Sequence, residues 1–173
     1  MEHIKQTIQK ANATGNLPDT YKPSWAVDIV EKYGNAEQFL TTFNPDKQVQ
    51  YARHELQCFA SEVAPSLTRL STTYGNNTAE AWLEIQLKDL SEFSGCKEKL
   101  TVKQFEDTAR TIILHYGHLK VTELMVFFQQ FKAGQYGKFY GAVDGLAITS
   151  ALKEFMKYRS VKLFEIESAR QRK

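Results

Sequence analysis

The sequence contains few of the features that mark secreted, membrane-spanning or disulfide-stabilised proteins. Its 173 residues include two cysteines, Cys58 and Cys96, which form neither a CxxC pair nor a disulfide framework. No apolar run approaches the roughly 20 residues needed to cross a bilayer. The N-terminus also lacks the apolar core of a signal peptide. We therefore expect a protein of the reducing cytoplasm that has no membrane partner.

Recognisable catalytic motifs are missing as well. There is no nucleophile elbow, and the glycine-rich stretch lacks the GK[ST] ending of a phosphate-binding loop. His54 and Cys58 are four residues apart on one predicted helix, but a zinc site needs two further ligands that no spacing indicates. His115 and His118 are separated by Gly117 at a predicted helix end. We expect no metal, no cofactor and no enzymatic activity.

Helical periodicity and helix caps are what the sequence does contain. Asn35, Thr101 and Asp144 each stand where a helix N-cap is expected, and Asn44 precedes a proline that fits the first helical turn. Apolar residues recur at spacings of three and four. The clearest stripes are Val49, Ala52, Leu56, Phe59 and Val63; Trp82, Leu83, Leu87, Leu90 and Phe93; and Val102, Phe105, Ala109, Ile112, Ile113 and Tyr116. This pattern predicts an all-α fold.

We expect one domain over residues 1–173, a multi-helix bundle with a short glycine–aromatic connector or hairpin at about 133–143. A subdivision into 1–95 and 100–173 is the alternative, because the charge balance changes there. Residues 101–173 hold 12 Lys and Arg against 7 Asp and Glu, a balance of +5. The remaining residues hold 10 against 13, or −3, which together give the overall +2. A mildly basic second half suits nucleic acid, an acidic partner or a solvated surface.

The most distinctive stretch is FFQQFKAGQYGKFYGAVDG, residues 127–145. Glycines alternate here with Tyr136, Phe139 and Tyr140, and Lys132 and Lys138 stand among them. Aromatic side chains interleaved with lysine are typical of proteins that stack on bases and pair with phosphates. The other interpretation is that these rings fold back onto the core and the glycines allow the turns. Both interpretations remain open from the sequence.

Two neighbouring helical segments, 102–116 and 122–132, are joined by a short link that contains Gly117. This spacing is that of a helix-turn-helix. The second segment is apolar on nearly all sides, however, which favours a buried helical hairpin over a helix that reads DNA.

The last predicted helix offers further cations, which would form one patch with the connector if the connector folds back on it. Charged residues on a surface helix also simply keep it solvated. The predicted binding residues are Lys132, Gln135, Tyr136, Lys138, Phe139, Tyr140, Lys153, Lys157 and Arg159.

Residues 123–159 carry an aromatic-rich helix, a lysine, the motif GxYGxxYG, an aspartate and a helix that ends in tyrosine and arginine. This segment resembles uncharacterised proteins of Bacteroidetes bacteria, their phages and their mobile elements. The resemblance implies a role in replication or in plasmid or phage maintenance. Our first hypothesis is therefore a non-enzymatic accessory protein that contacts DNA or RNA. The alternative is a protein-interaction or assembly module, for example a homo-oligomer, that uses the same aromatic connector.

Overall fold

The fold is all-α, as the sequence predicts. The computed structural model describes residues 23–60 and 64–172. The sequence also predicts a weak amphipathic helix over 2–13, from the spacing of Ile4, Ile8 and Ala11, and a loop rich in glycine and proline over 13–23, and nearly all of both lies outside the described residues. The helices are α2 (Ser24–Tyr33), α3 (Ala36–Thr42), the 3-10 helix η2 (Pro45–Lys47), α4 (Gln48–Arg53), α5 (Glu55–Ala60), α6 (Leu67–Tyr74), α7 (Asn76–Phe93), α8 (Val102–Tyr116), α9 (Val121–Lys132) and α10 (Gly145–Gln171). Among these helices, none is sufficiently long and apolar to cross a bilayer.

Three predicted N-caps are confirmed. Asn35 and Thr101 each form a capping box, in which their side chains accept the N–H of Gln38 and Gln104. Asp144 accepts the N–H of Leu146 and begins the long α10. These bonds satisfy donors that a helix start leaves without an intrahelical partner, which fixes where each helix begins.

The stripe predicted from Val49 to Val63 as one helical face is wrong over its described part. The helix breaks at His54, whose backbone has φ −120° and ψ 37°, so that α4 and α5 are separate helices. The break changes which side of each helix faces the core. Val49 and Leu56 are therefore exposed, whereas Phe59 is buried. Val63 lies outside the described residues.

The start of α7 also differs from the prediction. From the sequence, Thr78 is the expected N-cap, because a threonine follows Gly75-Asn76-Asn77, a typical turn sequence. The helix instead begins at Asn76, with Gly75 at the N-cap position. Gly75, at φ 104°, both ends α6 and precedes α7. A positive φ is accessible to glycine at little cost, which permits this sharp junction. The Thr78 hydroxyl instead donates to the carbonyl of Tyr74, the last residue of α6, and so spans the junction.

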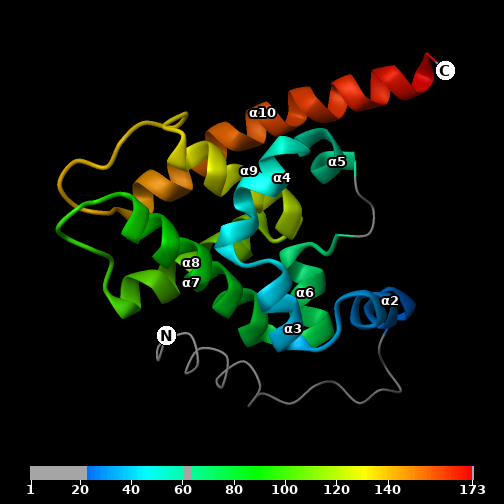
Figure 1. Ribbon diagram of the computed structural model, residues 1–173, viewed down its shortest axis with the longest axis horizontal. Helices are drawn as coiled ribbons and strands as arrows, with labels where there is room; N and C mark the ends of the chain where they lie inside the picture. Colours follow the sequence, from blue (N-terminus) through cyan, green and yellow to red (C-terminus); the bar gives the residue numbers. More distant parts are fainter. Residues whose placement is uncertain (1–22, 61–63, 173) are drawn as a thin grey trace.

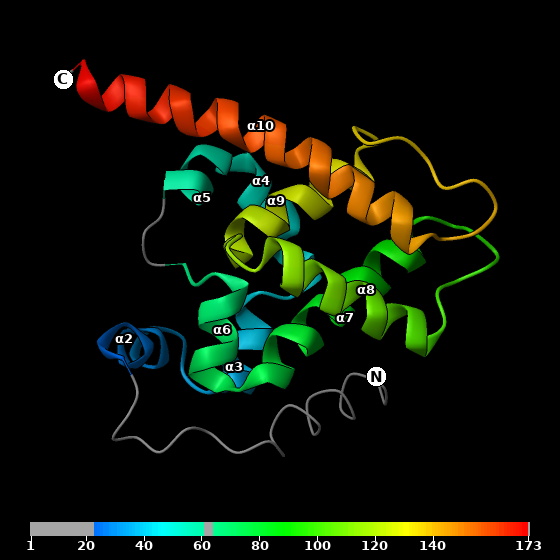
Figure 2. The same ribbon diagram turned by 180° about the vertical axis from the view of Figure 1, so that it is seen from behind.

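The central helix is α9, which the other helices surround (Figures 1 and 2). It packs against α4 and α5, which come from the N-terminal part of the chain, and against α7 and α10. Nearly all of its side chains are buried, including the polar Glu123 and Gln130. The burial predicted for the second of the two helices is confirmed, and α9 has no free face that could enter a DNA groove. The hairpin itself is not, because α8 packs chiefly against α7, α10 and α6 and buries only three of its residues.

One hydrophobic core draws residues from both sides of the boundary suggested at 95–100. Residues 133–143 form an irregular connector, not a hairpin. Their one regular contact is an isolated parallel bridge between Glu98 and Ala142. After this connector, α10 runs across the molecule, and its C-terminal end extends past the other helices (Figures 1 and 2).

Candidate interaction surface

The glycines of the connector adopt left-handed backbone conformations. Gly137 and Gly141 have φ values of 92° and 81°. A Cβ atom at either position would meet no other atom within 4 Å. Glycine is therefore required by the backbone conformation and not by close packing.

Two of the three predicted contact aromatics point inward. The Tyr136 ring packs against Phe127, with centroids 5.5 Å apart, and its hydroxyl donates to Oε1 of Gln130 at 2.5 Å. Burial, and to a lesser extent the charge of Glu55, raises the pKa of Tyr136. Phe139 stacks on Phe131 at 5.2 Å. These two rings anchor the connector to α9, as the second interpretation of the sequence predicts.

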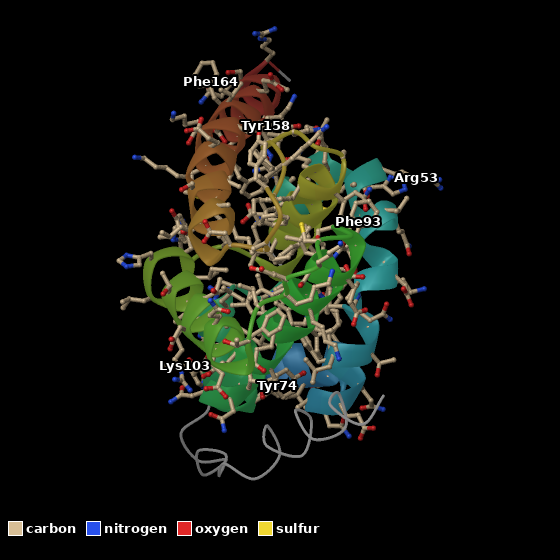
Figure 3. All side chains as sticks on the ribbon, turned by 90° about the vertical axis from the view of Figure 1, so that its left-hand side faces the viewer. Arg53, Tyr74, Phe93, Lys103, Tyr158 and Phe164 are labelled. Atoms are coloured by element: carbon tan, nitrogen blue, oxygen red, sulfur yellow. The ribbon has the colours of Figure 1, made fainter. Side chains whose placement is uncertain are left out.

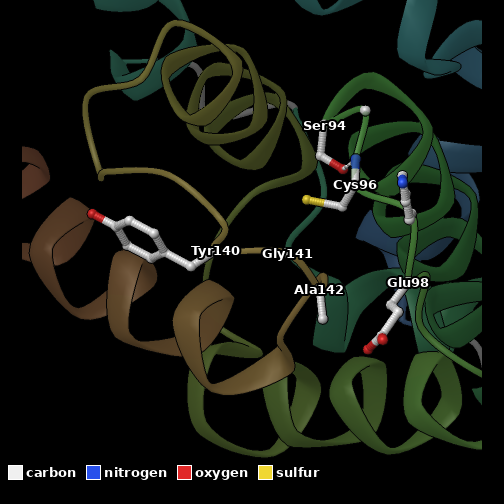
Figure 4. A pocket seen from close by; sticks show the side chains of 8 residues that line it. Ser94, Cys96, Glu98, Tyr140, Gly141 and Ala142 are labelled. Atoms are coloured by element: carbon white, nitrogen blue, oxygen red, sulfur yellow. Dashed lines mark hydrogen bonds between the residues drawn. The ribbon is translucent and has the colours of Figure 1, made fainter.

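Tyr140 is different, because 94% of it is exposed. Gln135 and Lys138 are exposed as well. The Tyr140 ring points away from Cys96 (Figure 4). It stands at the edge of an open depression of about 630 Å³, which residues 94–98 and 140–142 line. The outward surface of the connector thus consists of Gln135, Lys138 and Tyr140.

Lys132, another predicted contact, is paired inside the protein. Its ammonium group forms an ion pair with Asp89 of α7, and it lies 5.4 Å from the ring centroid of Phe93. Only 12% of the lysine side chain is exposed. A phosphate would have to compete with both contacts to reach it.

Arg159 belongs to a buried ionic cluster. Its Nε lies 3.0 Å from Oε1 of Glu123, whose side chain is completely buried. The other carboxylate oxygen of Glu123 accepts the backbone N–H of Lys120 at 3.0 Å. The Lys120 ammonium group in turn donates to the carbonyl of Phe59. This cluster joins α5, α9 and α10, so Arg159 holds the fold together and is not part of a free basic patch.

A second polar contact fixes the middle of α10. The Tyr158 hydroxyl lies 2.7 and 2.8 Å from the two carboxylate oxygens of Glu55. Burial, followed by this hydrogen bond, raises the pKa of Tyr158. Sequence reasoning missed both Glu55 and Glu123. An acid within the otherwise apolar α9 was the available signal for Glu123, because a buried carboxylate requires a partner.

The outer face of α10 carries two of the predicted contact residues, Lys153 and Lys157, both exposed. We define it as Leu146, Ser150, Lys153, Lys157, Val161 and Phe164, which recur at spacings of three and four. The exposed fractions of Leu146, Val161 and Phe164 are 76%, 57% and 73%. Phe164 stands at the outer edge of the projecting end, whereas Tyr158 lies between α10 and its neighbours (Figure 3).

His54 lies at the break between α4 and α5, and Cys58 lies within α5. Cys58 is buried and donates to the Tyr51 carbonyl at 3.4 Å. Burial, reinforced by Glu123 and Glu55, raises the pKa of this thiol to about 11, so it is protonated at neutral pH. Within residues 23–60 and 64–172, no three His, Cys, Asp or Glu residues are grouped closely enough to hold a metal ion.

Residues 99–172 match a family of unknown function, DUF6633. The matched segment begins just before α8 and includes α9, the connector and nearly the whole of α10. No curated protein and no solved structure matches the chain. The match assigns no activity, so a functional proposal has to rest on the surface described above.

Proposed function

We propose that this protein is a non-enzymatic interaction or assembly module, which contacts another protein through the outer face of α10. The supporting observation is the combination of a long helix with exposed apolar side chains. No described residue of α10 after Phe155 is buried. Val161 and Phe164 are nevertheless large and apolar, and they lie on the same face as Leu146 near the start of the helix.

The energetics favour a partner on this face. Burying a side chain such as Phe164 or Leu146 stabilises a complex by about 1.5–3 kcal/mol each. The inner side of this part of α10 packs on the core through Leu163 and Ile166, which are partly buried, whereas Val161 and Phe164 on its outer side are exposed. A partner that packs against the projecting end of α10 would bury these exposed side chains. Aromatic residues are also enriched among the residues that dominate binding energy at interfaces.

Nucleic acid is the second candidate partner, and one observation favours it. Lys138, Tyr140 and Lys153 are exposed, and neither lysine forms an ion pair with another described residue. An exposed tyrosine could stack on a base, and exposed lysines without ion pairs could pair with phosphates. On this hypothesis the protein is an accessory factor of a phage or mobile element, as the resemblance of residues 123–159 implies. The reduced number of free cations makes this surface smaller than the sequence predicts.

Photo-crosslinking in the cells that make the protein tests the proposal. A benzophenone amino acid replaces Phe164, and in the control it replaces Leu114, which is 79% exposed on α8. We expect protein adducts from position 164 and none from position 114. Adducts that nuclease treatment removes would instead support nucleic acid binding. No adduct at position 164, or equal adducts at both positions, would refute the proposed surface.

The nucleic acid candidate has its own direct test. Electrophoretic shifts with single- and double-stranded DNA are compared for the wild type and for a Lys138→Ala, Tyr140→Ala, Lys153→Ala triple variant at two salt concentrations. Binding through these residues would fall steeply with salt and would be weakened in the variant. No shift by the wild type would remove this candidate.

A further inference from the structure

The outer face of α10 differs in charge between its two halves. The first half presents Lys153 and Lys157, whereas Glu165 and Glu167 flank Phe164 in the second half. Lys157 pairs with Glu154 within the helix, and Lys162 pairs with Glu165.

Lys153 and Glu167 form no ion pair with any described residue. Glu167 accepts a single 3.3 Å hydrogen bond from Gln171. Both side chains are exposed. Lys153 and Glu167 are therefore an unpaired cation and an unpaired anion on opposite sides of the helix midpoint.

A helix with this arrangement is complementary to itself in the antiparallel direction. We propose that α10 pairs with α10 of a second copy of this chain, antiparallel, around a twofold axis near residue 159. This inference rests on the proposed function, and it identifies the occupant of the outer face. Lys153 of each copy then lies beside Phe164 and Glu167 of the other, and Ser150 lies opposite Ser168.

The symmetry doubles the effect of each contact, because a twofold interface contains every pair twice. The Lys153 ammonium group would lie over the Phe164 ring and close to the Glu167 carboxylate. It would therefore make a cation–π interaction and an ion pair at the same time. A parallel arrangement would instead place the lysines of the two copies beside one another and the glutamates beside one another. The distribution of charge thus favours the antiparallel direction.

The size of this face sets the expected affinity of the dimer. From Leu146 to Ser168 the helix extends about 33 Å, and a contact strip roughly 10 Å wide covers on the order of 330 Å² per copy. Stable interfaces typically bury about 800 Å² per partner. We expect a reversible dimer that dissociates on dilution, so the measurement has to extend to several hundred micromolar.

Sedimentation equilibrium of the full chain, at about 5–500 μM protein, tests the pairing by charge reversal. Lys153→Glu and Glu167→Lys should each weaken dimerisation by about tenfold, because two attractive pairs become repulsive. The Lys153→Glu, Glu167→Lys double variant should recover most of the wild-type affinity. Lys138→Glu, on the connector, is the matched control and should have no effect. Circular dichroism checks that every variant remains helical.

Disulfide trapping tests the direction of the helices. Ser150→Cys and Ser168→Cys proteins, both carrying Cys96→Ser, are mixed and oxidised. The antiparallel pairing predicts mainly the mixed 150–168 disulfide, whereas a parallel pairing would give 150–150 and 168–168 disulfides. Any of three results would overturn the inference. These are formation of the parallel disulfides, a double charge variant that dimerises as weakly as the single variants, and a protein that is monomeric at every concentration. Crosslinks from position 164 to a different protein, together with a monomer, would overturn the pairing while leaving the proposed function intact.

Discussion

Arg159→Ala provides the sharpest test of whether this arginine belongs to the core or to a binding surface. The change leaves the carboxylate of Glu123 completely buried without its 3.0 Å partner. Removing one member of a buried ion pair typically costs 3–5 kcal/mol. Here Lys120 Nζ remains 3.8 Å from the same carboxylate, and its backbone N–H still donates to the other oxygen. We therefore expect a loss near the lower limit, about 3 kcal/mol of unfolding free energy.

Urea denaturation followed by circular dichroism measures this loss. With a slope of about 1–3 kcal/mol per molar urea, the midpoint should fall by at least about 1 M. Lys157→Ala, which removes a solvent-exposed ion pair with Glu154, should change the unfolding free energy by less than about 1 kcal/mol. A Glu123→Gln, Arg159→Met double variant should recover part of the stability, because it removes both members of the buried pair while Lys120 keeps its hydrogen bond to the carbonyl of Phe59. If Arg159→Ala were no more destabilising than Lys157→Ala, the assignment of Arg159 to the core would be wrong.

Three further predictions concern single side chains. Burial raises the pKa of Tyr74 to about 12, and its neutral hydroxyl donates to the carbonyl of Gly34. The shift stabilises the folded protein fully at pH values below the unfolded-state pKa of about 10. This contribution should disappear as the pH rises from about 10 to 12, and urea denaturation of Tyr74→Phe over that range should show a smaller pH dependence. At pH 8 a thiol reagent should modify Cys96 in the native protein and reach Cys58 only after denaturation, as mass spectrometry of peptides would reveal. Gly137→Ala should cost about 1–2 kcal/mol in denaturation experiments because its φ is 92°, whereas Ala133→Gly in the same connector should cost less.

The helix starts could be read from the sequence because their signals are local. The capping residues Asn35, Thr101 and Asp144 bond to groups two or three residues away, so the sequence contains both partners. The burial of α9 could also be predicted, since its apolar residues leave no polar face. The break at His54 could not, because no glycine or proline marks it and the apolar spacing continues past it.

The roles of the cations depend on contacts between distant segments. Lys132 and Lys138 look equivalent in the sequence, yet Asp89 of α7 pairs with the first and leaves the second exposed. Arg159 and Lys157 differ in the same way, because Glu123 is 36 residues from Arg159. A count of basic residues therefore overestimates the cationic surface of the connector and α10.

The three aromatic residues of the connector also differ in burial, and the contacts they make in the fold explain the difference. Tyr136 and Phe139 reach Phe127 and Phe131 because the turn after α9 reverses the chain over the end of that helix. The next residue, Tyr140, contacts neither of these rings and is exposed. Composition alone could not separate these roles, since all three rings stand in one glycine-rich motif.

The segment that matches the family is completed by contacts from outside it. Its buried ion pair, Glu123 with Arg159, lies entirely within residues 99–172. Tyr158, however, requires Glu55 of α5, and the central α9 packs against α4 and α5. The N-terminal helices therefore cover the inner side of α9 and fix the middle of α10. They leave the outer face of α10 uncovered. The surface that we propose as an interface therefore lies within the matched segment, whereas its orientation depends on the N-terminal helices.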